Sequence, residues 1–180
     1  MRHEAIYTAL FPGSFNPIHY GHIDIAKRAL RVFDEVILAV YVHPGKPKLF
    51  TTDERLELVR EALCDEPRVR VAAYNQLTVE FAREVQAHAI IRGLRVFSDF
   101  ELEFRMALAN RRLAPEIELI NFISAEEHLH ISSSTIREIA SLGGDVSSMA
   151  PPHVVAALKR RFAELKAEGS TASFMSSLRE

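Results

Sequence analysis

The sequence predicts an α/β protein with a Rossmann-like open parallel sheet of five strands and helices on both faces. Five short runs of apolar and β-branched residues alternate with segments in which apolar residues recur at helical spacing. Strands that alternate with helices are joined by right-handed crossovers, and these produce a parallel sheet covered on both faces. The length of 180 residues suits one hydrophobic core and is short for two.

The five predicted strands are apolar runs, most of which stop at turn residues. They are expected over residues 5–11, 35–42, 69–73, 89–91 and 118–123. The first ends at Pro12-Gly13 and the second at Pro44-Gly45, because proline lacks an amide for the sheet and glycine permits turn geometry. The fourth is expected to end at Arg92-Gly93.

The predicted helices follow these strands in turn. They are expected over residues 21–32, 51–63, 79–86, 97–112, 134–141 and 153–165. The second begins with a capping box, in which Thr51 and Glu54 satisfy each other's free amide groups, and the last begins after Pro151-Pro152. We expect a single domain over residues 1–168 and a polar, Ser-rich, poorly ordered tail over 169–180.

Composition excludes several classes of protein. Apolar residues make up 48% and charged residues 26%, the proportions of a globular core rather than a disordered chain. The longest apolar run, Val36 to Val42, is too short to span a bilayer, and we expect neither a membrane partner nor a secretory signal. A net charge of −2 argues against a protein that coats nucleic acid. Cys64 is the single cysteine, which favours a reducing, cytoplasmic setting.

Unusual polar residues follow four of the five predicted strands. These clusters occupy residues 12–22, 43–48, 92–95 and 124–134. Because parallel strands bring their carboxyl ends to one edge of a sheet, the clusters are expected to meet there. Cationic, imidazole and hydroxyl groups beside helix N-termini are typical of a polyphosphate site.

His19, Gly21 and His22 form the most specific of these patterns. Gly21 lets a phosphate approach the backbone, and His22 can donate a hydrogen bond to a phosphate oxygen as charge develops on it. The alternatives are a helix-capping His22 with His19 in a loop, or, less favoured, a pair of zinc ligands, for which no third ligand lies at a familiar spacing.

The other polar residues each have an ordinary structural alternative. Lys46 suits a phosphate but could be a solvated surface lysine. Arg92 and Arg95 suit bidentate phosphate contacts but could pair with acids on the following helix, Asp99, Glu101 or Glu103. The serines 132–134 could serve as a helix cap, although three exceed what capping needs.

Several common motifs are absent from the sequence. It has no G-x-x-x-x-G-K-[ST] loop, no G-x-G-x-x-G after the first strand and no nucleophile elbow. These absences argue against a Walker-type nucleotidase, a dinucleotide oxidoreductase and a hydrolase with a serine or cysteine nucleophile.

The chain resembles the HxGH nucleotidyltransferases and, within them, the bacterial phosphopantetheine adenylyltransferase family, also called pantetheine-phosphate adenylyltransferases. The resemblance covers roughly residues 5–165 and rests on an ordered set of segments. They are FPGSFNPIHYGHIDI at 11–25, the Lys46 turn, FTTDERLELV at 50–59, IIRGLRVFSDFELEF at 90–104, NRRLAPEIE at 110–118, ISSSTIREIA at 131–140 and GGDV at 143–146.

This resemblance implies the nucleotidyltransferase fold and a defined reaction. The adenylyl group of ATP is transferred to 4′-phosphopantetheine, which gives 3′-dephospho-CoA and pyrophosphate, the penultimate step of coenzyme A biosynthesis. It further implies Mg²⁺ as a cofactor, a cytoplasmic homohexamer and feedback inhibition by CoA.

The resemblance implies functional roles for the residues of this sequence that match the family's motif positions. Those implied in catalysis are Ser14, His22, Lys46 and Arg92. Those implied in ATP binding are Ser14, Phe15, His22, Gly93, Leu94, Arg95, Glu103, His128, Leu129, His130, Ile131, Ser132, Ser133 and Ser134. Those implied in acceptor binding are Ser14, Lys46, Leu77, Thr78 and Arg92. The sequence departs from the usual family pattern at Ser14, Asn16, His19, Gln76 and His128.

Three alternatives compete with this interpretation. An adenylyltransferase for nicotinate or nicotinamide mononucleotide is favoured by His19, but the RGLR–DFE segment argues against it. A non-catalytic nucleotide-binding module is disfavoured because His22, Lys46, Arg92 and the serines are all retained. A class I aminoacyl-tRNA synthetase fragment would share HxGH, but the chain is short and has no KMSKS-like loop.

Overall fold

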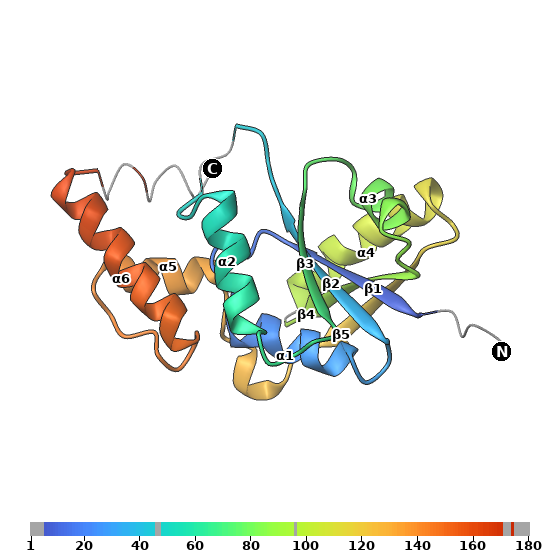
Figure 1. Ribbon diagram of the computed structural model, residues 1–180, viewed down its shortest axis with the longest axis horizontal. Helices are drawn as coiled ribbons and strands as arrows, with labels where there is room; N and C mark the ends of the chain where they lie inside the picture. The colour runs from blue at the N-terminus through green and yellow to red at the C-terminus, as the bar shows by residue number, and fades with distance from the viewer. Residues whose placement is uncertain (1–5, 46–47, 96, 171–173, 175–180) are drawn as a thin grey trace.

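Five parallel strands form a single sheet in the order β3-β2-β1-β4-β5 (Figure 1). The computed structural model describes residues 6–45, 48–95, 97–170 and 174, with the backbone alone for 97–99. The strands are β1 (Thr8–Gly13), β2 (Glu35–Tyr41), β3 (Val69–Tyr74), β4 (Ala89–Leu94) and β5 (Glu118–Ile123). The predicted five-stranded parallel sheet is therefore confirmed.

Helices cover both faces of the sheet, as predicted. They are α1 (Tyr20–Ala29), α2 (Thr52–Ala62), α3 (Thr78–Glu84), α4 (Phe97–Leu113), the short 3₁₀ helix η1 (Glu126–His128), α5 (Ser133–Ser141) and α6 (Pro152–Ala167). In Figure 1, α2, α5 and α6 lie on one side of the sheet, and α3 and α4 on the other.

The alternation of side chains along the strands divides the core into two. Leu10 and Ile37 point toward α3 and α4, in a cluster with Phe81. Their neighbours Phe11 and Leu38 point to the opposite face, where the larger cluster includes residues of α1, α2, α5 and α6. The central strands β1 and β2 are buried on both faces, which explains why their sequences are continuous apolar runs rather than an alternating pattern.

The capping box at the start of α2 is confirmed. The amide of Glu54 donates to Thr51 Oγ1 at 3.3 Å, and the amide of Thr51 donates to Glu54 Oε2 at 2.7 Å. This reciprocal cap fixes where α2 begins, directly after the buried residues Leu49 and Phe50.

The predicted ends of two strands, β1 and β4, were wrong, and both lie at the cavity described in the next subsection. β1 continues through Pro12 and Gly13, which pair in register with Ala39 and Val40 of β2. β4 pairs with β1 only at Ala9 and Leu10, so Pro12 breaks no ladder bond on that side.

The second error concerns β4, which continues to Leu94 and carries Arg92 and Gly93 within the strand. A Cβ on Gly93 would lie 2.2 Å from Cδ1 of Ile25. The glycine therefore serves the close packing of α1 on β4 and does not end the strand.

The parting of β1 from β4 creates the crevice that holds the site. Both strands run beyond Leu10 and Ile90, the last residues at which they pair. The chain adds β2 and β3 on one side of β1 and adds β4 and β5 on the other, so strand order reverses between β1 and β4. Ligands of open α/β sheets bind at this kind of switch point, beyond the carboxyl ends of the strands.

Two observations concern the ends and surface of the chain. Within the predicted tail 169–180, the amide of Ser170 donates to Leu165 O and Phe174 packs against the larger core cluster, while residues 171–173 and 175–180 lie outside the description. Among the described residues, no helix combines the length and apolar character needed to cross a bilayer.

Candidate active site

A cavity of about 450 Å³ opens at the switch point, and we refer to it as the main cavity. It is lined by Phe11, Pro12, Gly13, Ser14, His19, Gly21, His22, Ile25, Arg92, Gly93, Arg95, Leu102, Glu103, Ser124, Ser132, Ser133, Ser134 and Arg137. Three of the four polar clusters predicted from the sequence therefore meet here. The fourth contains Lys46, which lies outside the described residues.

A second cavity of about 240 Å³ adjoins the main one. Both are lined by Pro12, Gly13, Ser14, Arg92 and Glu103. The residues that line only the second cavity are Tyr41, Tyr74, Thr78, Ile90, Met106, Asn110 and Leu119. These side chains are apolar or aromatic with a few hydroxyl and amide groups, which suits a slender, mainly uncharged chain.

Residues 12–17, which we call the β1 turn, are held by arginines from three different elements. Arg92 of β4 donates from Nη1 to Pro12 O at 2.7 Å. Arg55 of α2 donates to Ser14 O at 2.7 Å, and Arg137 of α5 donates to Asn16 O at 2.6 Å. Charge-assisted hydrogen bonds of this kind are among the stronger ones in proteins. Three carbonyls of the turn are thereby fixed at alternate positions.

Two further contacts hold the β1 turn. Asn16 is 2% exposed, and its Oδ1 accepts from the amide of Phe50 at 3.2 Å. Ser133 Oγ donates to Pro17 O at 2.8 Å. Asn16, one of the departures from the usual family pattern, therefore points into the protein and joins the turn to the segment that precedes α2.

The two histidines of the HxGH pattern stack face to face at the N-terminal end of α1. Their ring centroids lie 3.6 Å apart with 23° between the planes. Phe15 contacts the His22 ring edge-on at 5.0 Å, and Phe15 itself is buried with a positive φ of 43°. The ring of Phe15 therefore supports His22 and does not line either cavity.

Burial keeps both imidazoles uncharged. Desolvation, with smaller effects from Arg95 and His128, lowers the pKa of His19 to about 3. Desolvation also lowers the pKa of His22 well below its ordinary value, and the charges of His19, Arg95 and Arg92 act in the same direction. A neutral imidazole still carries one N–H, so His22 can donate a hydrogen bond into the main cavity at neutral pH.

The Nδ1 atoms of His19, His22 and His128 are buried and have no hydrogen-bond partner. Gly21 lies close to two of these residues, since a Cβ on it would be 3.2 Å from the His19 ring and 3.7 Å from Cβ of His128. In this structure the absence of a side chain at Gly21 therefore lets the segments that carry His19 and His128 pack closely together. Among the described residues, no group of three or more His, Cys, Asp or Glu could hold a metal ion, and the zinc alternative gains no support.

Arg92 and Glu103 form an ion pair at the boundary of the two cavities. Nε of Arg92 lies 3.0 Å from both carboxylate oxygens of Glu103, and Nη2 lies 2.6 Å from Oε1. The structural alternative considered for Arg92 is therefore present. About a third of the arginine side chain remains exposed and lines both cavities, so it can also meet an anion.

The serines at the start of α5 combine a structural contact with a place in the cavity lining. Ser132 is the N-cap, and its Oγ accepts from the amide of Thr135 at 3.0 Å. Ser133 and Ser134 also line the main cavity, at the positive end of the helix dipole. Across the cavity, Arg95 donates to Ile131 O at 3.0 Å and so joins β4 to the start of this segment.

Arg137 is a lining residue that the sequence analysis missed. It lies one turn of α5 beyond Ser133 and Ser134, and this i, i+3 and i, i+4 spacing places all three on one face of the helix. Its Nε is buried without a partner, and burial lowers the pKa of its guanidinium. That helical spacing was the signal in the sequence that could have found it.

Several residues implied by the family resemblance do not line either cavity. They are Phe15, Leu77, Leu94, His128, Leu129, His130 and Ile131. Leu77 is 56% exposed just before α3, whereas its neighbour Thr78 lines the second cavity and contacts the Tyr74 hydroxyl at 3.0 Å. Gln76 donates to Glu84 at 2.7 Å and lies outside both linings.

The main cavity is electrostatically suited to an anionic ligand. Arg92, Arg95 and Arg137 line it, and Glu103, the only acid among the described residues of its lining, is paired with Arg92. Serine hydroxyls and the N-terminus of α5 add further donors. The arrangement can bind a polyphosphate and donate a hydrogen bond from His22 to it.

Comparisons with known proteins agree with this geometry. The family described as cytidylyltransferase-like matches residues 10–139. A solved bifunctional NMN adenylyltransferase/ADP ribose pyrophosphatase from Francisella tularensis superposes with a TM-score of 0.69 at 16% identity, over 91% of this chain and 53% of that one. At that identity the likeness shows the fold alone.

Curated relatives are much more similar in sequence. A phosphopantetheine adenylyltransferase from Chloroflexus aggregans is 53% identical over 156 residues, which cover 87% of this chain and 97% of that protein. One from Methylococcus capsulatus is also 53% identical, over 87% of this chain and 96% of its own length. The chain belongs to the phosphopantetheine adenylyltransferase family.

Proposed function

We propose that this chain catalyses the reaction of its family, transfer of the adenylyl group of ATP to 4′-phosphopantetheine, by direct in-line attack of the acceptor phosphate on the α-phosphorus. One observation carries the proposal: a cationic cavity that suits a triphosphate and a second cavity with a mainly uncharged lining meet at Ser14 and Arg92. An acceptor phosphate bound at that junction lies beside the phosphates of a nucleotide in the main cavity.

The reaction requires no protein nucleophile. The acceptor phosphate is anionic at neutral pH, and its attack expels pyrophosphate, so the protein has to position the reactants and stabilise charge. Positioning can supply ~7–11 kcal/mol of the barrier, and a single preorganised donor about 3 kcal/mol. His22 is the donor best placed to stabilise the developing charge, since its ring is fixed by His19 and Phe15.

In the proposed complex, ATP occupies the main cavity with its outer phosphates near the start of α5. Ser132–Ser134, Arg95 and Arg137 supply donors there. Mg²⁺ is proposed to bind together with the triphosphate. The ion would neutralise charge on the leaving pyrophosphate.

The acceptor is proposed to extend from Arg92, with Lys46 as a second phosphate ligand, into the second cavity. Tyr74, Thr78 and Met106 line a path that fits an arm of methylene and amide groups. A mononucleotide would place a ribose and a pyridine ring there instead. The 53% identity to a phosphopantetheine adenylyltransferase favours phosphopantetheine over the nicotinate or nicotinamide mononucleotide alternative.

We also propose a cytoplasmic enzyme, formed by a single catalytic domain over residues 1–168, that assembles as a homohexamer. The free thiol of Cys64 suits a reducing compartment. CoA would compete with both substrates, since it contains the same pantetheine arm and an adenylate. A patch on α4 supports self-association. It consists of Phe100, Phe104 and Leu108, which are exposed and recur at every fourth residue, so they lie on one face of the helix. Ile123 is also exposed and lies on the open edge strand β5.

Replacing His22 with alanine should lower kcat by at least 100-fold and change the affinity for ATP by less than threefold. The removed donor acts mainly on charge that appears in the transition state. Pyrophosphate release from ATP, with and without phosphopantetheine, measures kcat, and calorimetry measures ATP binding. His88→Ala, at the opposite end of the strands, is the control that retains turnover. Near-normal turnover of His22→Ala, or an equal loss of kcat and ATP affinity, would remove His22 from this role.

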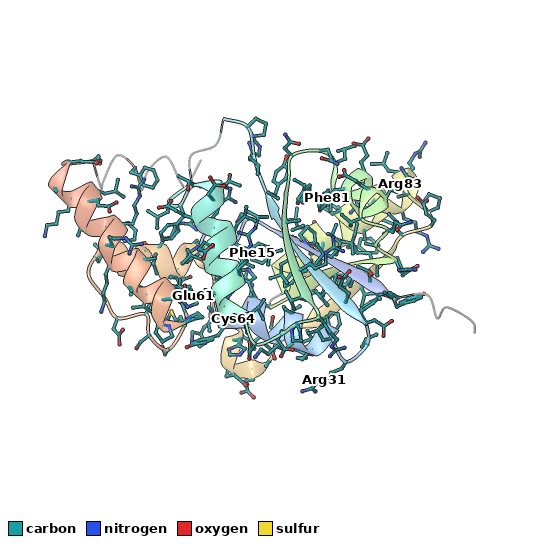
Figure 2. All side chains as sticks on the ribbon, viewed as in Figure 1. Phe15, Arg31, Glu61, Cys64, Phe81 and Arg83 are labelled. Carbon is teal, nitrogen blue, oxygen red and sulfur yellow. The ribbon has the colours of Figure 1, made fainter. Side chains whose placement is uncertain are left out.

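Arg92→Ala should chiefly raise the KM for phosphopantetheine, by 10-fold or more, because it removes the guanidinium at the cavity junction. Steady-state kinetics with each substrate varied in turn separate the acceptor KM from the ATP KM. Arg83→Ala is the matched control: Arg83 pairs with Glu116, and Figure 2 shows it on α3, well apart from Phe15 in the β1 turn. An unchanged acceptor KM in Arg92→Ala would contradict the assignment.

The buried His19 should make stability depend on pH. Its pKa of about 3 lies below the ordinary value of 6.5, so the unfolded chain binds a proton between these pH values and the folded chain does not. The resulting stability is complete above pH 6.5 and is lost as pH falls, by about 2 kcal/mol between pH 7 and 5. Urea unfolding at pH 7 and pH 5 measures the free energy of unfolding. In His19→Gln, the decrease of about 2 kcal/mol that His19 causes between these pH values should be absent. The exposed His130→Gln should keep the wild-type dependence, and equal pH dependence in all three proteins would refute the assignment.

The oligomer proposal predicts a mass near six times the 20.3 kDa chain in light scattering coupled to gel filtration. The double variant Phe104→Glu, Leu108→Glu places two charges in the exposed patch on α4 and should elute as smaller species. Leu142→Glu, at a site 85% exposed at the end of α5, should keep the wild-type mass. A monomeric wild type would contradict the proposal.

A further inference from the structure

Arg55 is a charged side chain that lies beneath the site and lines neither cavity. It is 2% exposed, on the face of α2 that packs toward the sheet. Because it is absent from both linings, it can act on a bound substrate only through the residues that it holds.

The guanidinium of Arg55 joins the carboxyl ends of two neighbouring strands. One nitrogen, Nη1, donates to Ser14 O at 2.7 Å and to Tyr41 O at 3.0 Å. Nη2 donates to Thr52 Oγ1 at 3.2 Å. Ser14 begins the loop that follows β1, and Tyr41 is the last residue of β2. Gly13 and Val40 are the last residues at which these strands pair with each other, and Arg55 bridges the two residues that follow them.

Arg55 has no carboxylate partner among the described residues. Burial lowers the pKa of its guanidinium, and its Nε has no hydrogen-bond partner. A buried cation without an acid is costly to fold. If the Ser14 and Tyr41 carbonyls needed only a hydrogen bond, a neutral donor could supply it at a lower free-energy cost of burial. The presence of a charged, planar guanidinium therefore points to a role in function.

We propose that Arg55 is a positioning residue for adenylyl transfer. It holds Ser14, which lines both cavities, against Tyr41, which lines the second cavity, at the point where the pairing of β1 with β2 ends. This inference rests on the proposed function, because it assigns Arg55 to aligning the acceptor phosphate with the nucleotide. A misplacement of about 1 Å at reacting groups can cost a factor of about 100 in rate.

Lysine cannot reproduce this arrangement. Its ammonium is a point charge on a flexible stem, whereas the guanidinium holds its donors in one rigid plane. Arg55→Lys therefore keeps a positive charge of similar length while it loses the fixed geometry between the Ser14 and Tyr41 carbonyls. It is the most informative single substitution at this position.

The experiment compares Arg55→Lys with Val59→Ala, a variant of the fully buried valine one turn further along α2, which contacts neither strand end through a hydrogen bond. Both variants should lower Tm. Only Arg55→Lys should lower kcat, by 10- to 100-fold, with both KM values within threefold of wild type. A kcat that matches Val59→Ala, or a loss confined to KM, would overturn the proposal.

A milder variant covers the case in which Arg55→Lys does not fold. Thr52→Val removes the hydroxyl that accepts from Nη2 and leaves Arg55 in place. It should lower kcat twofold to fivefold at nearly unchanged Tm, and an unchanged kcat would again overturn the proposal.

All rates are compared with wild type. A wild-type protein that releases no pyrophosphate with phosphopantetheine would refute the proposed function itself, a result distinct from failure of the Arg55 inference.

Discussion

The contact on which the site most depends is between guanidiniums and the backbone of the β1 turn. Arg92, Arg55 and Arg137 reach Pro12, Ser14 and Asn16 from three separate elements. Carbonyl oxygens carry partial negative charge and would repel a phosphate. Because these carbonyls accept hydrogen bonds from arginines, their oxygens face guanidiniums rather than a bound phosphate. The same hydrogen bonds attach the turn to β4, α2 and α5. Local electrostatics and the relative placement of three elements are thus set together.

A second constraint is the balance between charge and burial around the histidines. Arginines near the cavity favour anions. Burial is the main cause of the lowered pKa of His19 and His22, and the positive charge of Arg95 acts in the same direction on both. The histidines are therefore neutral before a substrate binds, and the positive charge of the site comes from the arginines. This division leaves His22 with a single N–H whose direction is fixed by its stacked neighbour.

Much of this arrangement could be predicted from the sequence because it follows strand ends. The apolar runs gave the sheet, and the polar residues after them identified His22, Arg92, Arg95 and the serines at the start of α5. Lys46 was identified in the same way but lies outside the described residues. Arg55 was missed because it binds backbone carbonyls, and a carbonyl leaves no trace in residue identity. Arg137 was missed although its helical spacing from Ser133 and Ser134 could have identified it.

The errors at strand ends have a related cause. Pro12-Gly13 and Gly93 were interpreted as stops, since proline and glycine usually interrupt strands. The strands continue through these residues because of tertiary context. β4 no longer pairs with β1 at Pro12, and Ile25 packs where a side chain on Gly93 would lie. The strand order β3-β2-β1-β4-β5 also lies beyond single-sequence patterning, because which strands become neighbours depends on contacts between distant segments.

The division of the crevice into two cavities has a practical consequence for inhibitor design. Residues that line only the second cavity, such as Tyr74, Met106 and Leu119, are separate from the arginines and serines of the main one. A compound that mimics ATP addresses features expected wherever a triphosphate is bound. A neutral, elongated compound anchored at Arg92 and directed along Tyr74 and Met106 would instead occupy the cavity proposed to bind the acceptor, and selectivity among adenylyltransferases should be sought there.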